Sequence, residues 1–177
     1  MPAPRQPEQY ILLPVNPWFI GFTLVLSLML NLLPLERGGW ALAMPDWIAI
    51  TLVFWSIHQP RRVGLTVAWL LGLVMDVNNA SLLGEHALAY SILSYVAIYM
   101  HRRARWFGYG GQVVHVLPLF LAAQLVVLTI RLIGGAAFPG VMYFSSSLAA
   151  TLMWPLVSAL YLAPQRRAAD KDENRPI

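Results

Sequence analysis

The first candidate for chemistry is an acid inside an apolar segment, Asp76 at the end of the stretch Val63–Val77. A carboxylate at the centre of a bilayer costs about 2.5–3.5 kcal/mol on insertion scales, so a chain that keeps one must offset that cost. Three roles are open: an acceptor for backbone N–H groups of the Asn78–Ser81 turn or the next helix, an ion-pair partner of Arg131, or a proton or ion site. An ion path would need more acids within the membrane, so the capping role is favoured.

A row of small residues leads up to this acid. Gly64, Ala68 and Gly72 recur every four residues and Asp76 continues the row, so all four stay near one face of a helix. Small side chains at this spacing let a second helix approach closely, which predicts a helix-packing face within the bundle or toward a partner. The pair Trp154-Pro155, in the middle of a later apolar stretch, is a second candidate for packing or partner binding.

Polar residues follow Asp76 directly, and a basic residue lies near the same predicted membrane boundary. The candidates for a structural polar cluster, or for a pocket open to the outer aqueous side, are Asp76, Asn78, Asn79, Glu85, His86 and Arg131. A metal site needs several convergent ligands. Adjacent residues of a helix diverge, so Glu85 and His86 are poorly placed to share an ion, and we predict no metal site.

The sequence offers no complete catalytic set. It has no cysteine, which excludes a thiol nucleophile or a disulfide. Ser145–Ser147 open an apolar segment, where a helix cap is the simplest role, and no histidine-plus-acid arrangement accompanies them. We therefore expect no enzymatic activity and no bound cofactor.

The composition is that of a membrane protein. Of the 177 residues 58% are hydrophobic and 11% charged, against about 25% charged in soluble domains. A spanning helix needs about 20 apolar residues. The candidate spans are Pro17–Leu33, Trp40–Ile57, Val63–Val77, Glu85–Met100, Gln112–Leu132 and Tyr143–Leu162, and the second of them is interrupted by Pro45-Asp46. We predict an all-α membrane protein in which residues 17–164 form one bundle of six transmembrane helices, between an N-terminal segment 1–16 and a disordered basic tail 165–177.

The positive charges predict the orientation of this bundle. Ten of the twelve lysines and arginines fall on one side of the predicted membrane, and only Arg37 and Arg131 fall on the other. The positive-inside rule therefore places both termini in the cytoplasm of a cell whose plasma membrane the chain crosses several times. The basic excess also attracts anionic lipid, and nucleic acid is not an expected partner.

Several short motifs of the chain resemble one known family. They are Pro45-Asp46-Trp47, Gln59-Pro60-Arg61-Arg62-Val63-Gly64, Gly72-Leu73-Val74-Met75-Asp76, Leu83-Gly84-Glu85-His86-Ala87-Leu88, Phe144-Ser145-Ser146 and Trp154-Pro155. On these motifs, over nearly its whole length, the chain resembles the rod shape-determining protein MreD family of the bacterial cell-elongation machinery.

This resemblance implies a non-enzymatic inner-membrane component of the rod complex, which maintains cell shape and lateral peptidoglycan synthesis. The implied partners are MreC, MreB and the glycosyltransferase–transpeptidase pair, and the expected docking surfaces are helix faces that receive a partner's transmembrane helix. The family also looks similar in fold to the substrate-binding subunits of energy-coupling-factor vitamin transporters. Such a subunit is the alternative function. Its helix of small residues spaced four apart is reduced here to Gly21 followed by Val25, which counts against it.

Overall fold

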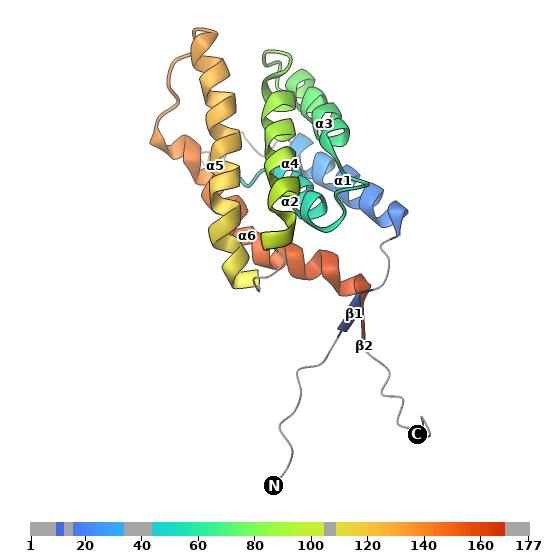
Figure 1. Cartoon of the computed structure of the whole chain (residues 1–177). Coiled ribbons are helices and arrows are strands. Elements are labelled where there is room, and N and C mark those ends of the chain that lie inside the picture. The colour runs from blue at the N-terminus through green and yellow to red at the C-terminus, as the bar shows by residue number, and fades with distance from the viewer. Residues whose placement is uncertain (1–9, 13–15, 34–43, 105–108, 169–177) are drawn as a thin grey trace, which may run out of the picture.

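The computed structural model describes residues 10–12, 16–33, 44–104 and 109–168 (Figure 1). The helices of this part are α1 (Pro17–Leu32), α2 (Trp47–His58), α3 (Leu65–Asn78), α4 (Glu85–Ala104), α5 (Tyr109–Ile133) and α6 (Ser145–Leu162). Two short 3₁₀ turns, η3 (Val141–Phe144) and η4 (Ala163–Gln165), flank α6. The predicted helical class is confirmed, and each predicted span overlaps one helix.

The lengths of these helices bear on the predicted membrane crossing. Gly111–Ile133 and Val141–Gln165 are long and apolar enough to cross a membrane, whereas α1, α2 and α3 are shorter apolar helices. The 12 residues of α2 extend about 18 Å, and the hydrocarbon core of a bilayer is about 30 Å thick. Six crossings with both termini in the cytoplasm therefore remain a prediction.

The first two helices begin at side-chain caps. The Asn16 side chain accepts a hydrogen bond from the Trp18 N–H, and Asp46 does the same for the Ala49 N–H. Because Asp46 caps α2, this helix starts at Trp47 and not at Trp40, where the apolar stretch begins. Residues 44–46 have no regular secondary structure, and residues 40–43 lie outside the described part of the chain.

The core of the bundle is built around α2. All ten residues from Ile48 to Ile57 are buried, as expected of a helix that is apolar on every side. Helices α1, α4 and α6 pack around it. The Trp55 indole N–H donates to the Thr23 hydroxyl at 2.9 Å, and the Trp55 ring stacks on Tyr161. Polar contacts of this core thus join α2 to α1 and aromatic contacts join it to α6.

The outer faces of the bundle are also apolar. Helix α6 presents four leucines spaced by four residues, each more than half exposed. They are Leu148, Leu152, Leu156 and Leu160. Helix α1 presents Trp18 and Phe22 in the same way. Apolar faces of this extent belong against lipid or against other apolar helices.

A two-stranded sheet joins the two ends of the described chain. Strand β1 (Tyr10–Leu12) pairs antiparallel with β2 (Arg166–Ala168), so α1 begins and α6 ends at the same end of the bundle (Figure 1). This pairing corrects part of the prediction, because residues 165–168 were expected to be disordered and instead form η4 and β2. Residues 169–177 of the expected tail, and residues 1–9, lie outside the described part.

Helix α4 lies between α3 and α5 (Figure 1). The α3–α4 connection and the connection from α5 to η3 both lie at the end of the bundle far from the β1–β2 sheet. The predicted polar residues between 76 and 86, together with Arg131, gather at this far end.

Candidate functional site

Asp76 is the structural link between α3 and α4. Its side chain is fully buried. The carboxylate accepts hydrogen bonds from the backbone N–H groups of Gly84 at 2.8 Å and His86 at 2.7 Å, and from the Ser81 hydroxyl at 3.2 Å. The first N–H groups of a helix lack partners within that helix and carry partial positive charge, so a carboxylate there is well stabilised. Asp76 therefore caps α4 from the end of α3.

Gly84 adopts the backbone conformation that this cap requires. Its φ angle is +102°, a left-handed conformation that side chains disfavour. The turn directs the Gly84 N–H to the Asp76 carboxylate and leads the chain into α4 at Glu85. The turn into α4 thus explains why the Leu83-Gly84-Glu85 motif has a glycine at its centre.

His86 forms an ion-pair geometry with the same carboxylate. Its Nδ1 lies 2.8 Å from Asp76 Oδ1, and its side chain is 12% exposed. Because a carboxylate can only accept, this hydrogen bond places a proton on Nδ1. The imidazole also meets the ring of Tyr90 edge-on, with centroids 6.0 Å apart. The ring is therefore held from two sides at the edge of the cavity described below.

Arg131 pairs with Glu85 and not with Asp76. The Arg131 Nε donates to Glu85 Oε1 at 2.5 Å, which joins α5 to the first residue of α4. Glu85 is 2% exposed, whereas the arginine side chain is 35% exposed. Arg131 is therefore not the ion-pair partner of Asp76, which was one of the three roles open for that acid.

The row of small residues faces the interior of the bundle except at its first member. Ala68 and Gly72 are buried. A Cβ added at Gly72 would lie 2.5 Å from the Ala87 nitrogen and 2.7 Å from the His86 carbonyl carbon, closer than real contacts allow. Gly64 is the N-cap of α3 and would meet only the Pro60 oxygen, at 4.0 Å. Gly72 therefore permits the close packing of α3 on α4.

The second packing candidate also lies inside the bundle. Trp154 is fully buried, and its indole N–H donates to Gln112 at 3.1 Å. Its ring lies near those of Phe54 and Phe120. Pro155, within α6, is partly buried. Trp154 thus contacts α2 and α5 and offers no surface to a partner.

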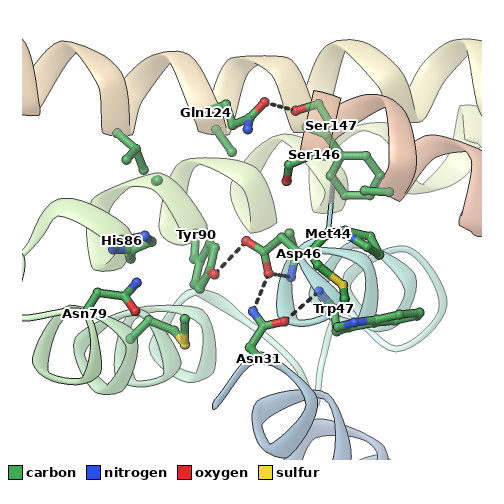
Figure 2. Close-up of a pocket in the computed structure, with 18 of the residues that line it drawn as sticks. Asn31, Met44, Asp46, Trp47, Asn79, His86, Tyr90, Gln124, Ser146 and Ser147 are labelled. Atoms are coloured by element: carbon green, nitrogen blue, oxygen red, sulfur yellow. Dashed lines mark hydrogen bonds between the residues drawn. The ribbon is translucent and has the colours of Figure 1, made fainter. Parts of the chain in front are cut away.

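A cavity of about 830 Å³ opens between the helices at the far end of the bundle (Figure 2). Among the six polar candidates, its lining includes Asn78, Asn79, His86 and Arg131. Asp76 and Glu85 do not line it, but each pairs with a residue that does, Asp76 with His86 and Glu85 with Arg131. The two buried acids are therefore linked to the cavity through their basic partners.

The polar centre of the cavity is Asp46, which is not among the site residues predicted from the sequence. Its carboxylate accepts from Asn31 Nδ2 at 2.9 Å, from the Tyr90 hydroxyl at 2.7 Å and from the Ala49 N–H at 2.9 Å (Figure 2). The Asn31 side-chain oxygen accepts from the Trp47 N–H in turn. One signal was available, because Asn31 and Asp46 are polar residues within apolar stretches, but nothing in the sequence paired them.

A second polar group lines the cavity from α5 and α6. Ser147 donates to the Gln124 side-chain oxygen, and the Gln124 nitrogen donates to the Tyr143 carbonyl at 2.8 Å. The expectation that Ser145–Ser147 cap the last helix is wrong, because the N-cap of α6 is Phe144 and no side chain caps it. Ser147 instead joins α6 to α5.

The chemistry available at this site is recognition by hydrogen bonds and charge. Among the described residues, no group of three or more histidine, aspartate or glutamate side chains is placed to hold a metal ion. The cavity combines a carboxylate, amides, an imidazole and a guanidinium with apolar walls. Such a combination is typical of a small-molecule site.

Comparison with known proteins gives two matches. The family model described as rod shape-determining protein MreD matches residues 14–164. The rod shape-determining protein MreD of Haemophilus influenzae is 26% identical over 155 residues, which cover 85% of this chain and 93% of that protein. No solved structure matches at a significant level.

Proposed function

Because the chain belongs to the rod shape-determining protein MreD family, we propose that it is a non-enzymatic, multi-pass component of the bacterial inner membrane that positions other members of the rod complex. The observation that carries this proposal is the family match over residues 14–164. The apolar outer faces of α1 and α6 support a place within the membrane. The proposed role is to maintain cell shape by supporting lateral peptidoglycan synthesis.

The proposed partners are MreC, MreB and the glycosyltransferase–transpeptidase pair. The connections from α2 to α3 and from α3 to α4 span only residues 59–64 and 79–84. Short connections offer little surface, so the partners of a protein of this kind must contact its helix faces. We assign the transmembrane helices of MreC and of the synthase pair to these faces, and MreB to the cytoplasmic side.

The surface proposed for MreC is a groove between α1 and the start of α3. It has a volume of about 510 Å³ and is lined by Pro17, Ile20, Gly21, Leu24, Arg62, Val63 and Val67. A Cβ added at Gly21 would meet no atom of the described chain within 4 Å. This open glycine lets the backbone of a second helix come close, which is how small residues promote association of membrane helices. The internal residues Ala68 and Gly72 cannot serve this purpose.

The test is a comparison of Gly21→Leu with Ala122→Leu, which places the same side chain at an exposed position of α5. Gly21→Leu should lose co-purification with MreC and fail to restore rod shape in a strain that lacks the native gene. Ala122→Leu should retain MreC, and both variants should accumulate normally in the membrane. Full co-purification of Gly21→Leu with MreC would reject the groove, and restored rod shape in a strain without MreC would reject the scaffold role.

The alternative of a substrate-binding transporter subunit finds no support in the comparisons. The matching family model and the matching relative are both described by rod shape determination. Uptake of a vitamin would be the only result in favour of that alternative. Growth of a vitamin auxotroph that depends on this chain would measure it, and we expect none.

A further inference from the structure

The cavity at the far end of the bundle holds a negative charge that no residue of the described chain neutralises. Within that part of the chain, the donors to the Asp46 carboxylate are an amide, a phenol and a backbone N–H, and all three are uncharged. The ion pairs of the described chain involve Asp76 and Glu85 but not Asp46. A carboxylate that is partly buried in an apolar bundle without a cation beside it is costly, and a cation from outside the protein would offset that cost.

The other charges around the cavity also favour a cation at this site. Arg131 lines the cavity, but Glu85 neutralises it, and Asp76 neutralises His86 whenever the imidazole carries a second proton. Among the described residues, the site and its immediate partners hold three carboxylates against one guanidinium and one imidazole, so the carboxylates outnumber the cations in either protonation state of the imidazole. The local potential is therefore negative, which attracts a cation and repels an anion.

The walls around Asp46 suit an organic cation better than a metal ion. Trp47, Tyr90, Phe120 and Tyr143 line the cavity, and aromatic faces attract ammonium groups. Ala123, Val127 and Ala150 provide apolar surface for a hydrocarbon stem. A volume near 830 Å³ lies within the range of small-molecule sites, about 300–1,000 Å³. Figure 2 shows the Asp46 carboxylate facing this space beside Tyr90.

We propose that this cavity binds an alkylammonium group, with Asp46 as its counter-ion and the aromatic and apolar walls around its stem. The ammonium group comes either from an aminolipid such as phosphatidylethanolamine or from a free alkylamine. This site is separate from the groove proposed for MreC, so each can fail without the other.

The test uses the full chain, purified in detergent and freed of lipid, with two matched pairs of probes. Dioctanoyl phosphatidylethanolamine is compared with dioctanoyl phosphatidylglycerol, and hexylamine with hexanol, by native mass spectrometry and by thermal shift. In at least one pair the ammonium probe should bind about tenfold or more tightly, the expected size of one charge-assisted contact. A preference in the lipid pair identifies an aminolipid, and a preference in the soluble pair alone identifies a free amine. Equal binding within both pairs would overturn the proposal.

Two variants locate the binding. Asp46→Asn keeps an oxygen that caps α2, because asparagine caps helices about as well as aspartate, but removes the charge. This variant should lose the preference for ammonium. Ala123→Phe fills the cavity and leaves Asp46 intact, and Leu125→Phe adds the same ring on the exposed side of α5. Ala123→Phe should lose the ammonium probe and Leu125→Phe should keep it. An unchanged preference in Asp46→Asn or unchanged binding in Ala123→Phe would overturn the assignment.

Discussion

The Asp76 carboxylate lies 2.8 Å from His86 Nδ1 and 2.7 Å from the His86 backbone nitrogen. One buried acid at the end of α3 thus fixes both the first turn of α4 and the orientation of an imidazole at the cavity. A role in architecture and a role near a binding site are combined in a single side chain.

Replacement of Asp76 should test how far this cap stabilises the bundle. Asp76→Ala removes the acceptor of two partly buried backbone N–H groups, those of Gly84 and His86, and a buried group without a partner costs about 1–3 kcal/mol. We expect the free energy of unfolding to fall by about 2–4 kcal/mol, measured by denaturant titration in detergent. Asp76→Asn keeps one acceptor and should lose less than Asp76→Ala. Equal stability of Asp76→Ala and the wild type would contradict the capping role.

The close packing of α3 on α4 predicts opposite effects at two glycines. Gly72→Ala forces a methyl group against the backbone of α4 and should destabilise the protein by about 1–3 kcal/mol, as overpacking does. Gly21→Ala adds a methyl group to an open helix position and should be neutral or stabilise by up to about 1 kcal/mol. Thermal unfolding followed by circular dichroism compares the two. A stable Gly72→Ala would mean that α3 and α4 lie farther apart than described.

The effects of replacing Glu85 and Arg131 on the free energy of unfolding should not be additive. Removing one partner of a buried pair leaves the other charge uncompensated, although the 35% exposure of Arg131 reduces this cost. We expect a coupling energy of about 0.5–2 kcal/mol between Glu85→Gln and Arg131→Gln in a double-mutant cycle. Strictly additive losses of unfolding free energy would show that the ion pair contributes nothing to stability.

Two buried serines of α6 should respond in opposite ways to the same change. Within the described chain, Ser158 carries the buried side-chain oxygen that lacks a hydrogen-bond partner, whereas Ser147 donates to Gln124. Ser158→Ala removes an unsatisfied polar group and should stabilise by about 0.5–2 kcal/mol. Ser147→Ala breaks a contact between helices and should destabilise by about 1 kcal/mol. Denaturation midpoints in one detergent give the comparison, and a destabilised Ser158→Ala would point to a partner within the bundle.

The positions of the helices could be read from the sequence because apolar stretches must be buried or face lipid. The predicted segment Gln112–Leu132 contains most of α5, and Glu85 begins both the fourth predicted span and α4. The second apolar stretch runs from Trp40 with an interruption at Pro45-Asp46, and only the structure shows that the Asp46 cap makes the helix begin after this interruption. The strand pairing of residues 10–12 with 166–168 was missed, because it depends on two ends that meet only in the folded chain.

The residues of the cavity were only partly predictable for the same reason. The clustering of Asp76, Asn78, Asn79 and His86 is local, because these residues occupy one turn and its flanks. The contacts of Asp46 with Asn31 and Tyr90 join residues 15 and 44 positions apart, and Arg131 reaches Glu85 across 46. Such contacts depend on how the helices pack, and apolar periodicity carries no information about which polar side chains will meet.

The sequence by itself determined the helical class, the approximate limits of the helices and the family, since these depend on hydrophobicity and short motifs. Only the tertiary structure decided which partner each acid within the bundle takes. Asp76 caps the N-terminus of α4, Glu85 pairs with Arg131, and the partly buried Asp46 accepts from neutral donors beside a cavity. The physical reason is that a charge removed from water must be satisfied in three dimensions, and the groups that satisfy it are brought near by packing and not by position along the chain.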